Sequence, residues 1–581
     1  MDQRMFLAAM LSIAVIFGYY LFFPPSPPRP PKPQPPASQS GVAIQDEPGD
    51  RQSAGTMGGT PAATQPDAPP RAAPVKVRQV KVDTPRYTAL FDTRGARLIS
   101  LKLKQYKMGK DYINWGDIVP PLGKYLKKPQ FDPTATMEMV KDKLSRVDPL
   151  DVVFVENQAL TGEFRRVGFS TDVEEVKIFS EAAQPGRIVF TGSAKNGLTL
   201  RKILTFQPDS YTINYEIQVI NYGKDPLLLT VLNLFGEGPD PGSDGDNVRS
   251  FYGPIFREDG SVDTESADGI EEKLIVRDPQ WLGITANYFL TAAAPESRID
   301  HGMFRVAKPS GAREDDEPIA YYGFELPVVR LSPGNMISGG ARLYFGPKQV
   351  DELTRFGNGL EESIQQTFDW LGPLADILLA ILHWFNGYTG NYGLAIILLT
   401  VVVRVGLFPL TYRGMVSMKR MSKLQPRVKV LREKYKDNKE RMNKEMMDMY
   451  KRHKVNPLGG CLPILVQLPI FFALYSALLS AIELRHASFV GWITDLSAMD
   501  PLYITPLLMG ATMFLQQRLT PTTMDPTQQR ILMWMPVIFM VFMFSFPAGL
   551  VLYWLTSNTL SILQQLIINR VHIPEPVEKE G

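Results

Sequence analysis

The stretch AIILLTVVVRVGLFPLTYR, residues 395–413, places one arginine, Arg404, inside an otherwise apolar run of membrane-spanning character. At a rise of about 1.5 Å per residue, Arg404 lies about 13 Å from the Arg413 end, within a hydrocarbon layer roughly 30 Å thick. An arginine at this depth either marks a functional site or extends its head group to the nearer interface. The rest of the chain has to decide between these two interpretations.

Charge is distributed very unevenly along the 581 residues. The formal net charge of the whole chain is +2. Residues 413–456 contain fifteen Lys or Arg and five Asp or Glu, so this segment carries +10 and the remainder carries −8. Because basic loops stay in the cytoplasm, the segment predicts on which side of a membrane each loop lies.

Long uncharged runs predict six transmembrane helices. Residues 5–23 form a run longer than the core of a cleaved signal peptide, and prolines follow it instead of a small-residue cleavage site, so an uncleaved anchor is expected. Residues 531–569 contain no charge and are too long for one span, and SFPAG at 545–549 predicts a turn that divides them. The predicted spans are 1–23, 388–410, 459–483, 501–518 and the pair within 530–569.

The remaining segments predict soluble or interfacial parts. Residues 24–74 contain fifteen of the 48 prolines and predict an extended linker. Residues 75–350 alternate polar and apolar side chains, as in YTINYEIQVINY at 211–222, which predicts a large antiparallel β domain. In residues 361–387, Asp369 and Asp376 interrupt an apolar face with helical spacing, so an amphipathic interfacial helix is expected.

The charge pattern then orients the chain. Both termini and the basic segment 411–458 are expected in the cytoplasm, together with loop 519–529 and the short tail 570–581. The β domain and the weakly charged loop 484–500 are expected on the outer side.

Polar side chains within the predicted spans are few. Thr400 lies one helical turn before Arg404, Gln467 lies in the third span, and TSNT at 556–559 lies in the last. No Asp or Glu within a span neutralises Arg404, so we expect water to reach it in a polar groove. Taken singly, each Thr, Ser or Gln is equally consistent with a hydrogen bond between helices.

The basic segment 411–458 predicts a helical hairpin with its turn at Asp437 and Asn438. Soft methionine side chains suit contact with varied apolar segments. A salt-bridged hairpin held near anionic lipid is the alternative, and a ribosome surface is a third interpretation. Aromatic residues are scarce there, so direct nucleic-acid recognition is not expected. The candidate capture residues are Met415, Met418, Met442, Met446 and Met449.

The sequence predicts no catalytic residue, no cofactor and no metal site. Five histidines lack metal-ligand spacing, and the serine-hydrolase, zinc-protease and phosphate-loop motifs are missing. The single cysteine, Cys461, opens an apolar run and is expected to be a buried, inert thiol.

Three stretches give the chain a specific resemblance: VNPLGGCLPILVQLPIFFALYSAL at 455–478, MDPTQQRILMWMPVIFMVF at 524–542 and FPAGLVLYWLTSN at 546–558. Together with the arginine span they resemble the YidC/Oxa/Alb insertase family, densely over residues 387–569. The linker and β domain resemble the periplasmic part of the Gram-negative form, a supersandwich similar to galactose-mutarotase-like domains. The resemblance implies a multi-domain membrane protein: an all-α polytopic core of six transmembrane helices, five of them forming the insertase core, plus a large all-β periplasmic supersandwich.

The resemblance also implies a hydrophilic groove open to the cytoplasm and to lipid. The family's groove arginine and threonine correspond to Arg404 and Thr400, and its tyrosine pair corresponds to Tyr553 and Trp554, where tryptophan is a departure. The basic ribosome-binding tail of some members has no counterpart in residues 570–581. The expected groove residues are Arg404, Thr400, Gln467, Tyr553, Trp554 and Asn558.

We therefore expect a membrane-protein insertase and folding chaperone, without enzymatic chemistry, in a bacterial inner membrane. It would move short polar tails through the groove and release apolar segments into lipid, alone or with the Sec translocon. Nascent membrane proteins and membrane lipid are the expected partners, with the ribosome and the signal recognition particle receptor as further candidates. A transporter or channel with Arg404 as an anion site is the alternative. A carbohydrate-acting enzyme would need a His/Glu pair, and the only histidine of the β domain is His301.

Overall fold

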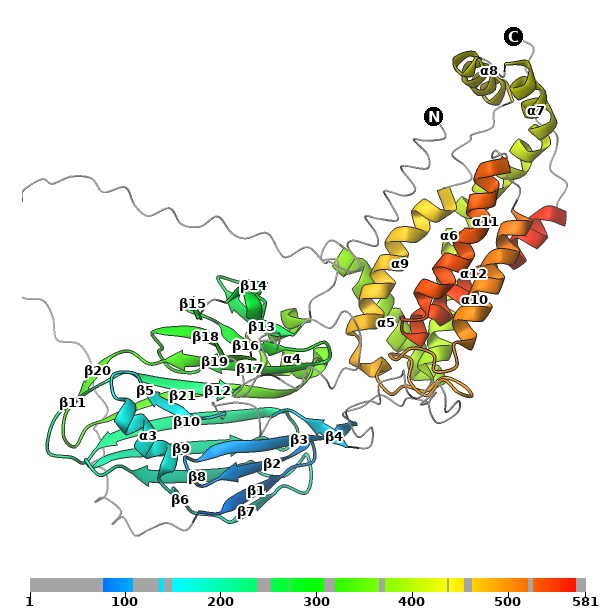
Figure 1. Cartoon of the computed structure of the whole chain (residues 1–581). Helices are drawn as coiled ribbons and strands as arrows, with labels where there is room; N and C mark the ends of the chain where they lie inside the picture. Colours follow the sequence, from blue (N-terminus) through cyan, green and yellow to red (C-terminus); the bar gives the residue numbers. More distant parts are fainter. Residues whose placement is uncertain are drawn as a thin grey trace, which may run out of the picture. The chain divides into compact units, whose positions relative to one another are not determined.

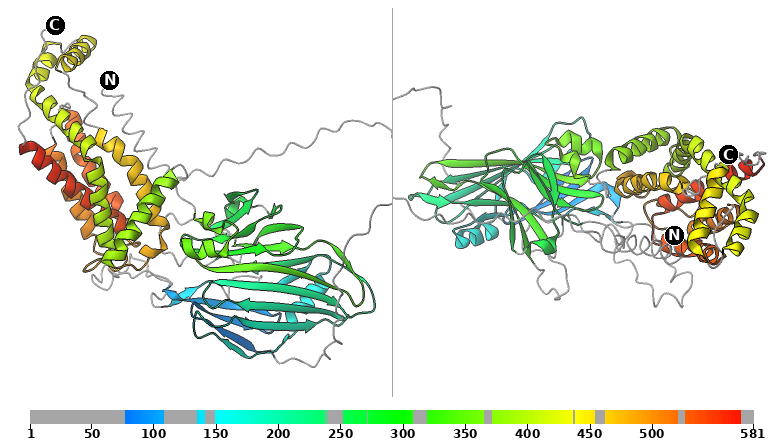
Figure 2. Two further views of the ribbon diagram at one scale, coloured as in Figure 1. Left: turned by 180° about the vertical axis from the view of Figure 1, so that it is seen from behind. Right: turned by 90° about the horizontal axis from the view of Figure 1, so that it is seen from above.

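The computed structural model describes eleven stretches of the chain. They are residues 77–107, 135–140, 149–236, 238, 252–270, 272–307, 319–364, 371–435, 438–453, 462–520 and 526–570. The predicted anchor 1–23, the predicted linker 24–74 and residues 571–581 of the predicted tail lie outside these residues. Figure 1 shows the fold of the whole chain, and Figure 2 shows it from behind and from above.

A nine-stranded antiparallel sheet forms the centre of the β domain (Figure 1). Alternation along its strands follows the sequence pattern, since in β10 the buried side chains of Ile213, Tyr215, Ile217 and Val219 are two residues apart. The strand order is β14 (Ser261–Thr264), β13 (Gly253–Glu258), β16 (Trp281–Thr285), β17 (Phe289–Pro295), β21 (Met336–Pro347), β10 (Thr212–Asn221), β9 (Leu198–Phe206), β8 (Gly186–Ser193) and β6 (Ser170–Thr171).

Two five-stranded sheets and a short pair complete the domain. One sheet has the order β4 (Thr136–Glu138), β3 (Arg97–Lys107), β2 (Tyr87–Asp92), β1 (Gln79–Asp83) and β7 (Glu175–Lys177). The other has the order β15 (Lys273–Val276), β18 (His301–Ala307), β19 (Ile319–Glu325), β12 (Val231–Gly236) and β5 (Val152–Phe154). β11 (Leu227–Leu229) pairs with β20 (Val329–Leu331), and α3 (Gln158–Arg166) and the short α4 (Val350–Phe356) are helical.

Both five-stranded sheets pack on the nine-stranded sheet. Phe91 of β2 meets Phe190 of β8 with ring centroids 5.9 Å apart, and Phe235 of β12 meets Tyr215 of β10 at 6.0 Å. These rings belong to one buried cluster, so a continuous core holds the layers together. The predicted combination of a large β supersandwich and an all-α domain is confirmed.

Eight helices follow the β domain in the described part of the chain (Figure 1). They are α5 (Gly372–Thr389), α6 (Tyr392–Lys423), α7 (Gln425–Lys434), α8 (Lys439–Arg452), α9 (Leu462–Ser480), α10 (Ile504–Leu519), α11 (Pro526–Met543) and α12 (Ala548–Arg570). Gly390 in the left-handed conformation ends α5, and Asn391 caps α6 by accepting a hydrogen bond from the Leu394 amide. The predicted turn at 545–549 falls between α11 and α12.

The arginine helix extends beyond the predicted end of the second span, whose position in a membrane stays a prediction. The arginine helix α6 does not end at residue 410 but continues to Lys423, so Met415 and Met418 lie on α6 and not on the hairpin. Residues 411–423 are polar but contain no strong helix breaker. The break comes just before Pro426, which cannot donate a backbone hydrogen bond and begins α7. Within the predicted interfacial segment 361–387, the described α-helix is α5, which begins at Gly372.

By length and composition, α6 is the one helix of the described residues that can cross a bilayer. Shorter apolar helical stretches are Gln467–Ser480 in α9 and Met533–Met543 in α11. One face of α6 exposes apolar side chains at intervals of three or four residues, which suits a lipid-facing stripe: Leu394, Leu398, Val402, Val405, Phe408 and Tyr412. The count of six spans stays a prediction.

Candidate substrate groove

Arg404 of α6 is held by a serine of α12. The Nε of Arg404 donates a hydrogen bond to the Ser557 Oγ at 3.1 Å, and its Nη2 donates to the same oxygen. Seven residues further along both helices, the Gln564 Nε2 donates to the Thr411 Oγ1 at 2.9 Å. Because both pairs are separated by the same number of residues, α6 and α12 run parallel and in register.

A second polar contact joins α9 to the same face of α12. The Gln467 Nε2 donates a hydrogen bond to the hydroxyl of Tyr553, whose side chain is buried. Tyr553, Ser557 and Ser561 are four residues apart, so they lie on one face of α12. The Ser561 hydroxyl bonds to the Ser557 carbonyl at 2.9 Å. α12 therefore supplies a polar stripe that contacts α6 and α9.

The charge of Arg404 has no carboxylate beside it among the described residues. The sequences of α6, α9, α10, α11 and α12 contain no Asp or Glu. A serine hydroxyl accepts hydrogen bonds but leaves the positive charge in place. Arg404 thus keeps an unneutralised charge that an incoming anionic group can meet.

The structure brings together only part of the predicted groove set. Arg404, Gln467 and Tyr553 take part in the hydrogen bonds above. Thr400 is fully buried, and its hydroxyl donates to the Ile396 carbonyl of its own helix at 2.6 Å, so its proton does not point into a groove.

The two remaining predicted residues, Trp554 and Asn558, each come one residue after a member of the polar stripe, Tyr553 or Ser557. The ring of Trp554 packs against Phe471 of α9, with centroids 5.1 Å apart, and against Phe539 of α11 at 4.6 Å. Asn558 is 7% exposed. In the described part of the chain, neither the Trp554 Nε1 nor the Asn558 Nδ2 has a hydrogen-bond partner.

Sequence reasoning missed Ser557, the residue that bonds to Arg404. It lies within the polar cluster 556–559, and the prediction selected its neighbour Asn558. The available signal was the four-residue spacing from Tyr553, which places Ser557 and not Asn558 on the face of the tyrosine.

Loop residues 484–500 close the end of the helical domain at which α12 begins. The Ala548 amide donates to the Ala498 carbonyl at 2.7 Å, and the Gly549 amide donates to the Leu496 carbonyl at 2.9 Å. These donors are first-turn amides, which have no partner within their own helix. The loop therefore completes the start of α12.

The same loop also contacts the starts of α6 and α10. The Asn391 side chain donates to the Phe489 carbonyl at 2.9 Å. The buried Asp500 carboxylate accepts hydrogen bonds from the Thr505 amide and hydroxyl, both at 2.7 Å. Three helix starts are thus tied by one loop, and this end of the groove is closed by hydrogen bonds.

The α7–α8 hairpin has an apolar groove on its surface. The groove encloses ≈ 410 Å³. Val430 within it is 63% exposed, so its apolar side chain is accessible to a bound segment. Met449, one of the predicted capture residues, is in the lining, whereas Met442 and Met446 are half-buried on the same helix. The lining residues are Pro426, Arg427, Val430, Leu431 and Met449.

The β domain contains a histidine–carboxylate cluster that the sequence did not predict. Across the β18–β19 pair, His301 faces Glu325, with the His301 Nε2 3.8 Å from a Glu325 oxygen and the Nδ1 2.8 Å from the Asp300 carboxylate. Such a set can move a proton or contact a cation.

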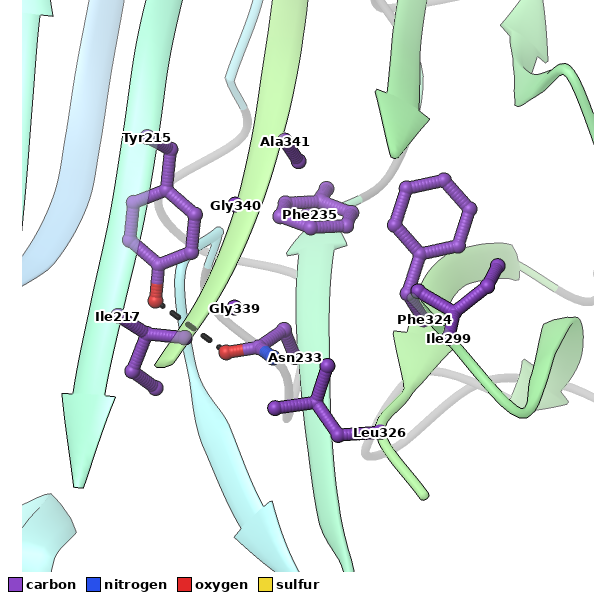
Figure 3. A pocket seen from close by; sticks show the side chains of 10 residues that line it. All are labelled: Tyr215, Ile217, Asn233, Phe235, Ile299, Phe324, Leu326, Gly339, Gly340 and Ala341. Carbon is purple, nitrogen blue, oxygen red and sulfur yellow. Dashed lines mark hydrogen bonds between the residues drawn. The ribbon is translucent and has the colours of Figure 1, made fainter. Parts of the chain in front are cut away.

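A pocket lined in part by Ile299 and Phe324, the sequence neighbours of Asp300 and Glu325, is very small. It lies between the β sheets, where the Tyr215 hydroxyl donates to the Asn233 side chain at 3.3 Å (Figure 3). It encloses ≈ 10 Å³, about the space of one water molecule. A sugar does not fit there.

Two family models cover most of the chain. The model described as 60Kd inner membrane protein matches residues 384–575, and the model of the YidC periplasmic domain matches residues 122–381. The membrane protein insertase YidC of Geotalea daltonii is 37% identical over 578 residues, covering 98% of this chain and 99% of the relative. That of Geobacter metallireducens is 38% identical over 573 residues, covering 98% of each.

Two solved structures are more distant. The crystal structure of an active YidC insertase with its first transmembrane domain resolved has a TM-score of 0.36 and 16% identity, covering 86% of this chain and 95% of its own. A galactose mutarotase related enzyme from Lactobacillus acidophilus has a TM-score of 0.30 and 10% identity, covering 46% and 97%. At these values neither structure bears on the assignment.

A helical domain joined to a large β supersandwich, together with these family matches and relatives, places the chain in the class of membrane protein insertases that carry a periplasmic domain. The chain belongs to the YidC family within this class. Its function is the insertion of membrane proteins, and its substrates are therefore membrane proteins.

Proposed function

We propose that this insertase moves short polar tails through the groove between α6, α9 and α12, with Arg404 as the attracting charge. The observation that carries this proposal is the Arg404–Ser557 contact in a helix set without a carboxylate. Two unit charges about 4 Å apart attract by roughly 4 kcal/mol at an effective dielectric constant of about 20. An acidic tail would therefore gain free energy at this point that a neutral tail would not.

The α7–α8 hairpin makes the first contact in this scheme. Its apolar groove with Met449 can hold an apolar segment, and its basic residues keep it near the membrane surface. Met442 and Met446 extend the same methionine-containing helix. Two of the predicted capture residues, Met415 and Met418, belong to α6. In this scheme they lie on the path of the substrate from the hairpin to the groove.

Release into lipid follows the outer surface of α9 and α11. One face of α11 exposes Trp534, Ile538 and Val541, which are 67%, 65% and 56% exposed. An apolar segment sliding along these side chains leaves water and gains roughly 25 cal/mol per Å² of apolar surface. This transfer supplies the driving force, so no nucleotide, cofactor or catalytic step is needed.

The cellular setting belongs to the same proposal. The protein lies in a bacterial inner membrane with both termini cytoplasmic and the β domain in the periplasm. It acts alone or with the Sec translocon, and it also assists the folding of inserted segments. The ribosome and the signal recognition particle receptor are candidate partners of the basic hairpin, whose residues 425–452 contain ten Lys or Arg and five Asp or Glu and so carry +5 of the +10 charge of residues 413–456.

Photocrosslinking during synthesis of a small single-span substrate tests the proposal. A photoreactive residue replaces Gln467, which lies in the polar contact with Tyr553, and in a matched control it replaces Val405, which is 67% exposed on the lipid-facing stripe of α6. The expected result is an adduct between the substrate tail and position 467 that is much stronger than at 405. Equal adducts at both positions, or none at 467, would contradict the groove path.

A further inference from the structure

Two buried hydrogen-bond donors of α12, each one residue after a member of the polar stripe, have no partner among the described residues. They are the indole Nε1 of Trp554 and the amide Nδ2 of Asn558. An indole N–H can only donate, and an amide NH₂ carries two donors. A buried donor without an acceptor destabilises the state in which it is buried. The resting protein therefore contains two unsatisfied donors at the centre of its functional helix.

The two donors are spaced along one face of α12. Positions 554 and 558 are four residues apart, so the side chains lie one above the other, about 6 Å apart along the helix axis. In an extended polypeptide, carbonyl groups on the same edge repeat every two residues, roughly 6.6–6.8 Å. The spacing of the donors thus approximates the spacing of carbonyls i and i+2 of an extended chain that runs along α12.

The neighbouring stripe of α12 is already satisfied by the protein. Tyr553 and Ser557, each one residue earlier, contact Gln467 and Arg404. The stripe of Trp554 and Asn558 has no such protein acceptor. One stripe therefore holds the helices together, and the next remains available for a bound segment.

We propose that Trp554 and Asn558 form a backbone-binding pair that donates hydrogen bonds to two carbonyl oxygens of the extended polar tail of a substrate. This inference rests on the proposed function, because it concerns the tail that enters the groove. Arg404 selects acidic side chains, whereas the pair binds a group present in every polypeptide. The pair thus extends the substrate class to neutral tails.

The shielding of the donors fits this role. The ring of Trp554 is covered by Phe471 of α9 and Phe539 of α11, two helices along which the apolar segment is proposed to leave. A segment that separates these rings from α12 uncovers the indole N–H at the place where its own carbonyls arrive. Two unsatisfied donors favour this opening, since they gain partners only in the loaded state.

Insertion of one single-span substrate with a neutral tail, in vesicles containing the full-length protein, tests the pair. Trp554→Phe removes the donor and keeps an aromatic ring, and Asn558→Leu removes the amide at similar size. Each is expected to lower the insertion rate by roughly three- to tenfold, the effect of one lost hydrogen bond. The control is Thr559→Val, since Thr559 is exposed and its hydroxyl bonds to the Leu555 carbonyl of its own helix.

Thermal unfolding separates a binding role from a structural one. Because each substitution removes an unsatisfied buried donor, the melting temperature should stay equal or rise while insertion falls. A fall in both would mean that the residues only support the fold, and unchanged insertion in both variants would overturn the pair.

A spectroscopic readout reports the indole directly. The difference Raman spectrum between the wild type and Trp554→Phe isolates this indole N–H, which should become hydrogen-bonded only when the substrate is bound. An unchanged indole signal would also overturn the inference. The proposed function is judged separately, by the photocrosslinks at position 467 and by whether Arg404 discriminates between acidic and neutral tails.

Discussion

Replacing Arg404 by alanine should slow the insertion of acidic tails far more than that of neutral tails. Arg404 contacts Ser557 and has no carboxylate in the described helices around it, so its charge is available to a substrate. A hydrogen bond that involves a charged group contributes about 1.5–3 kcal/mol. Its loss corresponds to roughly a ten- to hundredfold lower rate for an acidic tail, if the bond forms in the rate-limiting step.

The assay compares two substrates with the same apolar segment and the same tail length. One tail contains Asp and Glu, and the other contains Asn and Gln at the same positions. Insertion into vesicles is followed by protection of the tail from added protease. Arg404→Lys is the matched control, because it keeps the charge and loses only the forked geometry of the guanidinium, and it should retain most of the preference for acidic tails.

Loss of folding does not explain the expected result. The alanine variant no longer contains a charge in an apolar setting, and the freed Ser557 hydroxyl can bond to the carbonyl four residues earlier in its own helix. The helical domain should therefore remain intact, which thermal unfolding checks. An equal slowing of both substrates by Arg404→Ala would refute the electrostatic role.

Three other substitutions test separate parts of the structure. Ser557→Asp gives Arg404 an internal carboxylate, so acidic tails should lose their advantage as in the alanine variant, in the same protease assay. Asp500→Ala removes the acceptor of two hydrogen bonds at the start of α10, and it should lower the melting temperature and increase hydrogen exchange in loop 484–500. Lys202→Met should destabilise the β domain by roughly 3 kcal/mol, measured by denaturant unfolding, because the buried Lys202 Nζ donates to three main-chain carbonyls at 2.7, 3.1 and 2.7 Å. Burial lowers the pKa of Lys202 to about 7, whereas its ordinary value is 10.5. Between these two pH values Lys202 binds a proton in the unfolded chain but not in the folded domain, so the stability of the wild-type domain should rise with pH. The stability of Lys202→Met should lack this increase.

Features that depend on the local sequence pattern could be predicted. Alternation at 211–222 gave strand β10, and SFPAG at 545–549 gave the turn between α11 and α12, since both follow from the conformational preferences of a few adjacent residues. The position of Arg404 inside a long helix followed from the length of the apolar run. These features need no knowledge of a neighbouring helix.

Features that depend on the packing of distant segments could not be predicted in the same way. Ser557 and Asn558 are adjacent polar residues, and only the rotation of α12 against α6 decides which one meets Arg404. His301 and Glu325 are brought together by the register of β18 and β19, which single-sequence reading does not define. The length of α6 was misjudged for a different reason, because a change from apolar to basic residues ends a membrane span but not a helix.

The shared register of α6 and α12 gives the groove a direction. On the side toward the helix starts, Ile396 lies close to Gly549, and loop residues 484–500 cover both helices. On the other side of Arg404, Thr411 bonds to Gln564, so polar contacts continue. The proposed groove is therefore covered by the loop at one end, and polar contacts lie on both sides of Arg404: Gln467 with Tyr553 toward the helix starts, and Thr411 with Gln564 on the other side.

This asymmetry reduces the barrier that a polar tail must cross. Arg404 lies twelve residues after Tyr392, the first residue of α6, a distance of about 18 Å along the helix. A full hydrocarbon layer is roughly 30 Å thick. A tail that reaches Arg404 from the far end of α6 has only this shorter path left, and the free energy of releasing the attached apolar segment into lipid can carry it across. The position of the arginine along α6, and not only its charge, thus determines how far the groove assists insertion.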